Sequence, residues 1–325
     1  MQSCSMVSYT YEQVAGQLKI WNKEIPVDEL LNSSKYSEID KKKIEIIINA
    51  KQFFLRHFEL KSRAIYETFS PLDGAAVTYL LIATPFDSLR PKEFYFPLIG
   101  SFPYLGFFDL QAAKKKSLEF SNTHFVFIRP VYAYSTLGFF DDPILSSFLH
   151  FDVMELEELI FHEMFHTLFF INNDVDLNEN LADFFATKIL KYYYLVELER
   201  PQEWENFEKL VKVQSERREI LVDLAKKYED LLIQKKPTNK EEAWKWWEKF
   251  LDEAQDLELK KINNPAFLSS FLTYQKHQST LENLSWPSGL TPVDQYKKIE
   301  TLYYLFIRDK KNQLPFADYL TRNLR

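Results

Sequence analysis

The chain has 325 residues, of which 46% are hydrophobic and 16% aromatic, and its formal net charge is -7 at pH 7. It is long enough for a sizeable core, and its acidic balance gives no reason to expect nucleic acid or an acidic membrane surface as partner. No apolar run reaches the length of a membrane-spanning helix, and a single cysteine excludes disulfides within the chain. Only six glycines favour a helix-rich structure with few tight turns.

The first 70 residues form a predominantly helical segment in this interpretation. The apolar spacing predicts short helices over residues 9–22 and 26–31 and a long helix over residues 39–68. His57 falls on the apolar side of the long helix. We interpret it as a core or rim residue and not as a metal ligand.

The character of the sequence then changes to β-type runs. Residues 76–84, 94–100 and 123–132 predict strands, with prolines marking the turns between them. A helix over residues 109–120, capped by Asp109, interrupts the series. Together these elements predict a small sheet next to the segment that follows.

That segment contains an HExxH pattern, His162-Glu163-x-x-His166, within an apolar run. On a helix, positions four apart lie on one face, so both imidazoles can reach one metal ion. Glu163 is offset by about 100° from His162, which lets its carboxylate reach a water on that metal without ligating it. The pattern therefore predicts two zinc ligands and a general base for hydrolysis.

The surroundings of the pattern support this interpretation over a chance match. The flanking residues are apolar, so the helix is expected to be buried, and a buried helix with unpaired His and Glu side chains would be costly. A bound metal removes that cost. Asp152 and Glu155 read as a capping box that opens the helix.

A catalytic zinc also needs a third protein ligand. Glu179 is the candidate, because a loop of about six residues can bring a second helix, capped by Asp176 or Asn178, back beside the histidines. Asp183, one turn later, could accept the outer ring N–H of a ligand histidine. Two alternatives stay open: Glu179 as a capping-box partner of Asp176, and Asp174 or Asp176 as the third ligand.

Two sets of motifs resemble known families. The pair His162-Glu163-x-x-His166 and Asn178-Glu179-x-x-Ala182 resembles the gluzincin zinc peptidases. Tyr-Ser-Thr-Leu-Gly-Phe-Phe-Asp-Asp-Pro-Ile-Leu at 134–145 and Tyr-Leu-Gly-Phe-Phe-Asp at 104–109 resemble the predicted aminopeptidases of bacteria, many of them lipoproteins. The resemblance covers about residues 4–195. Met164-Phe165 departs from the Leu-Ala that is usual there, and Phe165 would narrow the cleft.

The resemblance implies a zinc-dependent peptidase, with His162, His166 and Glu179 as metal ligands and Glu163 as base. By analogy with gluzincins, residues 131–135 are a candidate edge strand that pairs with the substrate backbone, with a plain surface loop as the alternative. A Tyr or Arg usually helps to hold the developing oxyanion. Tyr134 is the first candidate for this catalytic role, and Arg129 is the second.

The last part of the chain is helical and charged. Residues 200–262 predict a helical hairpin that breaks at Pro237, with its tryptophans in the hairpin core. Residues 265–285 and 292–322 predict two final helices, the second opened by Thr291-Pro292.

The only cysteine, Cys4, directly precedes a polar start that the resembling family shares. It predicts an exported protein, lipid-anchored to a membrane at Cys4 and facing the periplasm. The alternative is an ordinary cytoplasmic start. Oligomeric state is not indicated by the sequence.

Taken together, we expect an α+β, zincin-like metallopeptidase core, a small sheet plus the HExxH helix, with extensive flanking helices. The predicted regions are an N-terminal helical segment (1–70), the catalytic core (71–195) and a helical C-terminal region (196–325). The expected function is that of a zinc-dependent peptidase, an aminopeptidase, acting on peptides. The alternative is a zinc-stabilised binding or scaffold protein without turnover that uses the 200–262 hairpin as its partner surface.

Overall fold

The computed structural model describes residues 15–61, 64–96, 100–133, 141–172, 174–274, 281, 284, 286–287, 289–309 and 314–324. The fold is mixed α+β, mostly helical with small sheets.

The chain separates into two compact units, each built from segments that are distant in sequence. The first unit comprises Met1–Asn22, Leu72–Tyr132 and Val211–Gln275, and the second comprises Lys23–Pro71, Ala133–Leu210 and Lys276–Arg325. The three consecutive regions predicted from the sequence were assigned by expected function as well as by compactness. That division stays a prediction.

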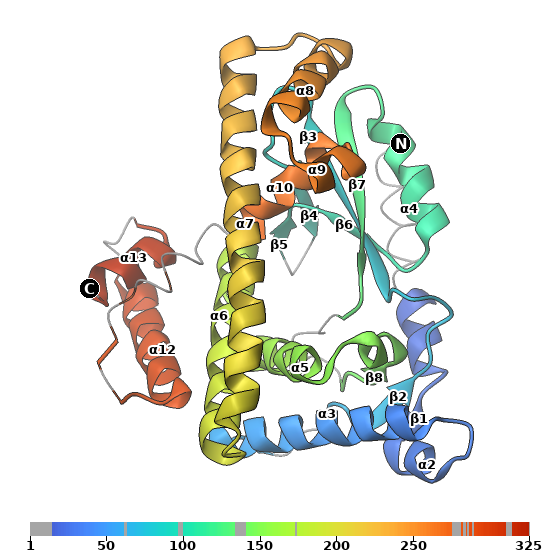
Figure 1. The fold of residues 1–325 in the computed structure, drawn as a ribbon, viewed down its shortest axis with the longest axis vertical. Coiled ribbons are helices and arrows are strands. Elements are labelled where there is room, and N and C mark those ends of the chain that lie inside the picture. The colour runs from blue at the N-terminus through green and yellow to red at the C-terminus, as the bar shows by residue number, and fades with distance from the viewer. Residues whose placement is uncertain are drawn as a thin grey trace. The chain divides into compact units, whose positions relative to one another are not determined.

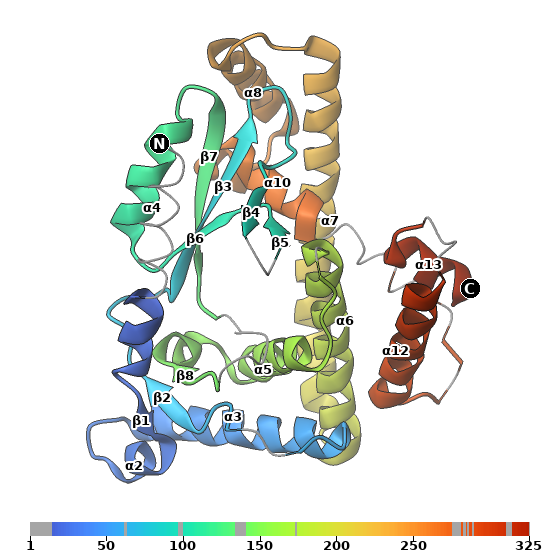
Figure 2. The same cartoon turned by 180° about the vertical axis from the view of Figure 1, so that it is seen from behind.

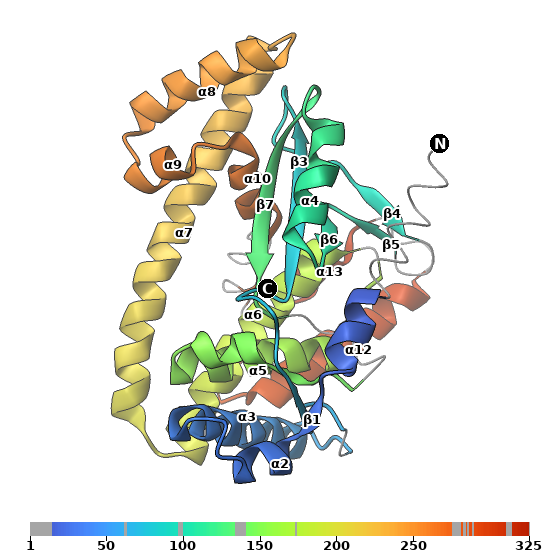
Figure 3. The ribbon, with the colours of Figure 1, turned by 90° about the vertical axis from the view of Figure 1, so that its right-hand side faces the viewer.

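The first unit is organised on an antiparallel sheet in the order β6-β3-β7. Strands β3 (Thr78–Pro85) and β7 (His124–Val131) pair along their whole length, and β6 (Leu105–Phe107) pairs with the other edge of β3. Helices α4 (Leu110–Ser117) and α10 (Pro265–Tyr274) cover opposite faces of this sheet, as Figure 3 shows.

Alternation along β7 explains how both faces of the sheet are covered. Val126 and Ile128 pack on the cluster that contains Ala113 of α4, whereas Phe125 and Phe127 pack on the cluster that contains Ala266 of α10. Successive side chains of a strand point to opposite faces, so one strand contributes to two apolar layers.

Most predicted β-type runs are confirmed, with one correction. The runs at 76–84 and 123–132 correspond to β3 and β7. The run at 94–100 is not one strand, because β4 (Phe94–Phe96) and β5 (Gly100–Phe102) form an antiparallel pair of their own. Asp109 caps α4 as predicted, since its carboxylate accepts the N–H of Ala112 at 2.7 Å.

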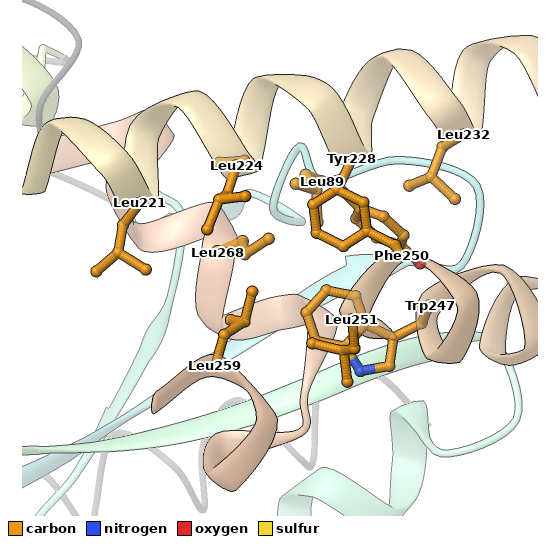
Figure 4. Packing of buried hydrophobic residues seen from close by; sticks show 11 residues of the cluster. Leu89, Leu221, Leu224, Tyr228, Leu232, Trp247, Phe250, Leu251, Leu259 and Leu268 are labelled. Carbon is orange, nitrogen blue, oxygen red and sulfur yellow. The ribbon is translucent and has the colours of Figure 1, made fainter. Parts of the chain in front are cut away.

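The predicted helices on either side of Pro237 are present as α7 (Pro201–Lys235) and α8 (Lys240–Ala254). Tyr228 of α7 packs its ring against Trp247 and Phe250 of α8, and Trp247 is fully buried. Figure 4 shows the cluster, which also includes Leu89, Leu259 and Leu268. The tryptophan at its centre is therefore a core residue, as the sequence indicated.

The second unit is a stack of three helices, α3 (Glu38–His57), α5 (Val153–Leu168) and α6 (Val175–Tyr192). Figures 1 and 2 show α5 packed on α3 and beside α6. Aromatic rings join the layers: Phe54 of α3 stacks on Phe161 at 6.4 Å, and Phe165 stacks on Phe185 of α6 at 4.7 Å. The predicted metal-binding helix is therefore held on two sides by other helices.

The prediction that the long helix continues to residue 68 is wrong. Helix α3 ends at His57, and Glu59 adopts a positive φ of 53°, which stops the helical path. The chain then enters β2 (Thr68–Ser70), which pairs antiparallel with β1 (Ile25–Pro26) and parallel with β8 (Ile144–Leu145). His57 stacks on Phe53 at 5.1 Å, which confirms it as a packing residue.

The remaining described elements are short or terminal, and one expectation changes. The single helix expected over 292–322 is two helices, α12 (Pro292–Arg308), capped by Thr291 as predicted, and α13 (Phe316–Asn323). The others are a helical stretch at 15–21, α2 (Val27–Asn32), η1 (Leu118–Phe120), η2 (Ser146–His150), η3 (Tyr193–Glu197) and α9 (Leu257–Ile262). Among the described residues, no helix is both long and apolar enough to cross a membrane.

Candidate metal centre

Helix α5 presents two histidines from consecutive turns. The capping box of Asp152 and Glu155 opens the helix, as predicted from the sequence. The Nε2 atoms of His162 and His166 lie 3.1 Å apart, with the two rings almost perpendicular at 85°. His166 and Glu163 are both buried, each with 6% of its surface exposed. The helix thus brings two imidazole nitrogens to one point inside the second unit.

The turn between α5 and α6 is fixed by Asn178. Its side chain accepts the N–H of Ile171 at 2.8 Å and donates to the carbonyl of the same residue at 2.7 Å, and both bonds are buried. The N-cap of α6 is Asp174, whose carboxylate accepts from Leu177 N–H at 3.2 Å. The sequence predicted Asp176 or Asn178 as this N-cap, and that prediction is wrong. The two hydrogen bonds of Asn178 hold the loop between α5 and α6 closed, so the next residue, Glu179, lies toward α5.

Glu179 is the third member of the group. Its Oε2 lies 3.6 Å from His162 Nε2, and its Oε1 lies 3.6 Å from His166 Nε2. Tetrahedral zinc, with bonds of about 2.0–2.1 Å to nitrogen and oxygen, places neighbouring ligand atoms about 3.3 Å apart. The three donor atoms lie within 4.8 Å of one another, so the group could hold a metal ion, and its donors suit zinc. Among the described residues this group includes neither Asp174 nor Asp176.

Asp183 supports the group from outside. One turn after Glu179, its Oδ1 lies 2.8 Å from Nδ1 of His162. This contact, expected from the sequence, holds a proton on Nδ1, so that Nε2 is the ring nitrogen that faces the other two donors. The Nδ1 of His166 is buried and has no hydrogen-bond partner among the described residues.

Burial and charge determine the proton affinities of the site. Burial and the charge of the neighbouring His162 together lower the pKa of His166 to about 4, against the opposing charges of Glu179 and Asp183. Burial also lowers the pKa of His162, but hydrogen bonds to Asp183 and Glu179 outweigh that effect and raise it well above its usual value. A protein with this donor set must lose a proton when a metal binds.

Glu163 faces a set of carboxylates. Burial, with smaller contributions from the negative charges of Glu179 and Asp142, raises the pKa of Glu163 to about 7 against the opposing effect of His162. Asp142 belongs to the 134–145 motif and is buried, with 4% of its surface exposed. The charge of Asp142, a residue of this motif, is therefore one of those that act on Glu163.

Tyr66 is a neighbour of the site that no sequence pattern indicates. This tyrosine is buried, with 2% exposed, and the charge of Glu163 is among those that raise its pKa. A tyrosine in a turn carries no spacing pattern, so only the fold could place it near the HExxH helix.

The remaining candidates fall elsewhere or outside the described residues. Tyr134 and Cys4 lie outside the described residues. Arg129 lies on β7 in the first unit, and Val131 is the last residue of that edge strand. Their predicted roles in holding the oxyanion or pairing with substrate stay predictions.

Comparison with known proteins agrees with the geometry. A family model described as "Putative aminopeptidase" matches residues 8–314. Searches among curated proteins and among solved structures found no match.

Proposed function

The chain belongs to this aminopeptidase family, and on that premise we propose that it is a zinc-dependent peptidase with a zincin-like catalytic core. The observation that carries the proposal is the convergence of His162 Nε2, His166 Nε2 and a Glu179 carboxylate beside the buried Glu163. Membership of the family implies a peptide substrate.

In this proposal His162, His166 and Glu179 hold the ion, and Asp183 keeps the His162 ring in the ligating tautomer. Zinc, when bound, supplies Lewis-acid polarisation of the scissile carbonyl and of the attacking water. Glu163 takes a proton from that water and delivers it to the leaving amine. Burial keeps bulk water away from the Glu163 carboxylate and from the His166 imidazole, whereas the His162 side chain stays 17% exposed.

The finer assignments belong to the same proposal. Cleavage after the first residue of the peptide, the aminopeptidase reaction, follows from the family name. Tyr134, and after it Arg129, are the groups proposed to hold the oxyanion. Residues 131–135 are proposed to pair with the substrate backbone, because β7 is an edge strand of its sheet among the described residues.

The metal is tested by elemental analysis of the purified protein. We expect about one zinc per chain, and a large loss of zinc affinity in Glu179→Gln. Full affinity in that variant would remove Glu179 from the ligand set. Asp176→Asn, which changes a carboxylate outside the His162, His166 and Glu179 group, serves as the matched control.

The reaction is tested with Glu163→Gln against a library of peptides. This variant should keep zinc and fold while losing hydrolysis by several orders of magnitude. Glu158→Gln is the control on the same helix, because the Glu158 carboxylate accepts from Thr187 Oγ1 at 2.6 Å. Equal turnover by wild type and Glu163→Gln would assign the activity to another protein. A zinc-loaded chain that cleaves nothing would favour the scaffold alternative.

We also propose that the protein is exported and lipid-anchored through Cys4, facing the periplasm. The placement of the only cysteine before a polar start supports this location. Incorporation of labelled fatty acid by the natural gene product, compared with its Cys4→Ser variant, provides the test. Equal labelling of both proteins, or of neither, would contradict the anchor.

A further inference from the structure

Three pairs of neighbouring side chains join α5 to α6 at intervals of one helical turn. On α5 they involve Glu158, His162 and His166, and their partners on α6 are, in the same order, Thr187, Asp183 and Glu179. Each step of four residues along α5 is matched by a step of four residues back along α6, about 6 Å of helix rise. Because positions four apart lie on one face of a helix, the three pairs follow one line between the two helices.

The pair farthest from the loop between the helices is Thr187 and Glu158. The hydroxyl of Thr187 donates to Oε1 of Glu158 at 2.6 Å, from one helix to the other, in partly buried surroundings. A hydrogen bond of this kind is stronger than one at the open surface, because the local dielectric constant is lower. This pair therefore fastens α6 to α5 one turn away from the contact between Asp183 and His162.

The hydroxyl of Thr187 also has an acceptor within its own helix. The backbone carbonyl of Asp183, four residues earlier, lies 3.2 Å from Oγ1, as is common for a threonine inside a helix. A hydroxyl has a single proton to donate, and the contact with Glu158 is shorter by 0.6 Å. The carboxyl group on the other helix is therefore the principal acceptor.

The next pair is sensitive to the register between the helices. Oδ1 of Asp183 lies 2.8 Å from Nδ1 of His162, and a slide of α6 along α5 by about 1 Å would take these atoms beyond hydrogen-bond range. The buried hydrogen bonds of Asn178 hold α6 at the loop end. Thr187 holds it on the other side, so Asp183 lies between two fixed points of the same helix.

We propose that Thr187 is a positioning residue for the candidate metal site: its hydrogen bond to Glu158 fixes the register of α6 on α5 and so keeps Asp183 on Nδ1 of His162. This inference rests on the proposed function. Thr187 touches neither the metal nor the substrate in it, and acts through Asp183. Its effect is therefore expected on the affinity for metal, before any turnover is measured.

The first test uses Thr187→Val, which keeps the shape of the side chain and removes the hydroxyl. In competition with a chromogenic chelator, we expect zinc to bind about 3- to 10-fold more weakly, less than for loss of a residue that contacts a ligand directly. Thr187→Ser keeps the hydroxyl and should bind zinc as wild type does, which packing of the threonine methyl group alone would not explain. Glu158→Gln keeps an oxygen that accepts the bond and should also retain the affinity.

Two controls separate positioning from a general loss of stability. Thr301→Val on the exposed part of α12 removes a hydroxyl that donates to the carbonyl four residues earlier, at 2.7 Å, and should leave zinc affinity unchanged. Ile189→Val removes a methyl group from a fully buried side chain of α6, so it should lower the urea midpoint without weakening zinc binding. Equal losses of affinity in Ile189→Val and Thr187→Val would overturn the inference, because the effect would then be one of stability.

A double variant tests whether Thr187 acts through Asp183. In a chain that already carries Asp183→Asn, adding Thr187→Val should weaken zinc binding by less than about 2-fold, because the contact that Thr187 positions is already weakened. Fold losses that multiply, or an unchanged affinity in Thr187→Val alone, would overturn the inference and leave the proposed peptidase function standing. Wild type that binds no zinc would reject both.

Discussion

The carboxylate of Asp183 lies 2.8 Å from Nδ1 of His162, on the edge of the ring that faces away from the other atoms of the candidate metal group. A contact of this kind fixes the tautomer of a ligand histidine and raises its basicity. It connects the second helix of the site, α6, with the first ligand on α5.

Asp183→Asn is therefore expected to weaken metal binding about 10- to 100-fold while leaving the ligands in place. The dissociation constant of zinc, measured by competition with a chromogenic chelator, gives the answer. Lys188 is five residues further along α6, above the ring of Phe184, so Lys188→Gln serves as a control and should leave zinc affinity unchanged. Unchanged affinity in Asp183→Asn would show that the tautomer is fixed without the carboxylate.

The helix that carries the candidate metal site could be predicted from the sequence because the relevant pattern is local. Four-residue spacing places His162 and His166 on one face, and the capping box of Asp152 marks where the helix begins. Glu179 needed only a loop length and a second amphipathic helix. Such features depend on residues close in sequence, so they could be predicted. The error concerned the residue that caps α6.

What could not be predicted depends on pairing between distant segments. The β1-β2-β8 sheet has strands of two or three residues, too short for any alternation to appear in the sequence. Without that signal, the predicted helix runs from residue 39 to residue 68, where β2 begins, although α3 ends at His57. The turn at Tyr66 could not be predicted either, because a positive φ is normally expected at glycine or asparagine and not at tyrosine.

The two hydrogen bonds between the Asn178 side chain and the backbone of Ile171 give a second prediction. Asn178→Ala leaves the buried N–H and C=O of Ile171 without their hydrogen-bond partners. This should lower the free energy of unfolding by about 2–4 kcal/mol. Loosening this turn should also lower zinc affinity, because Glu179 follows directly. Urea unfolding and zinc titration of the same preparation measure both effects.

The same substitution on an exposed helix supplies the control for Asn178. Asn32 donates to the carbonyl of Asp28 at 2.8 Å at the surface, so Asn32→Ala should change stability by less than about 0.5 kcal/mol. An equal decrease in the free energy of unfolding in the two variants would mean that the hydrogen bonds of Asn178 do not fix the turn.

A third prediction concerns a buried acid that belongs to the same helix but not to the site. Glu157 is 4% exposed and accepts the Tyr194 hydroxyl at 2.7 Å. Burial raises the pKa of this carboxyl from 4.5 to about 7, an effect that the bond from Tyr194 only partly offsets. In the unfolded chain the group ionises near its ordinary value, so between these two pH values the folded protein binds more protons.

The sign of the pH dependence follows from this difference. Because the folded state binds the extra proton, wild type should lose stability relative to Glu157→Gln as pH rises from 4.5 to 7, by about 3 kcal/mol in total. Above pH 7 the difference should stay constant. Urea unfolding of both proteins at pH 5, 6, 7 and 8 measures it, with exposed Glu45→Gln as the control that should show no such trend. A difference that grows toward acid pH would mean that Glu157 is ionised in the folded protein.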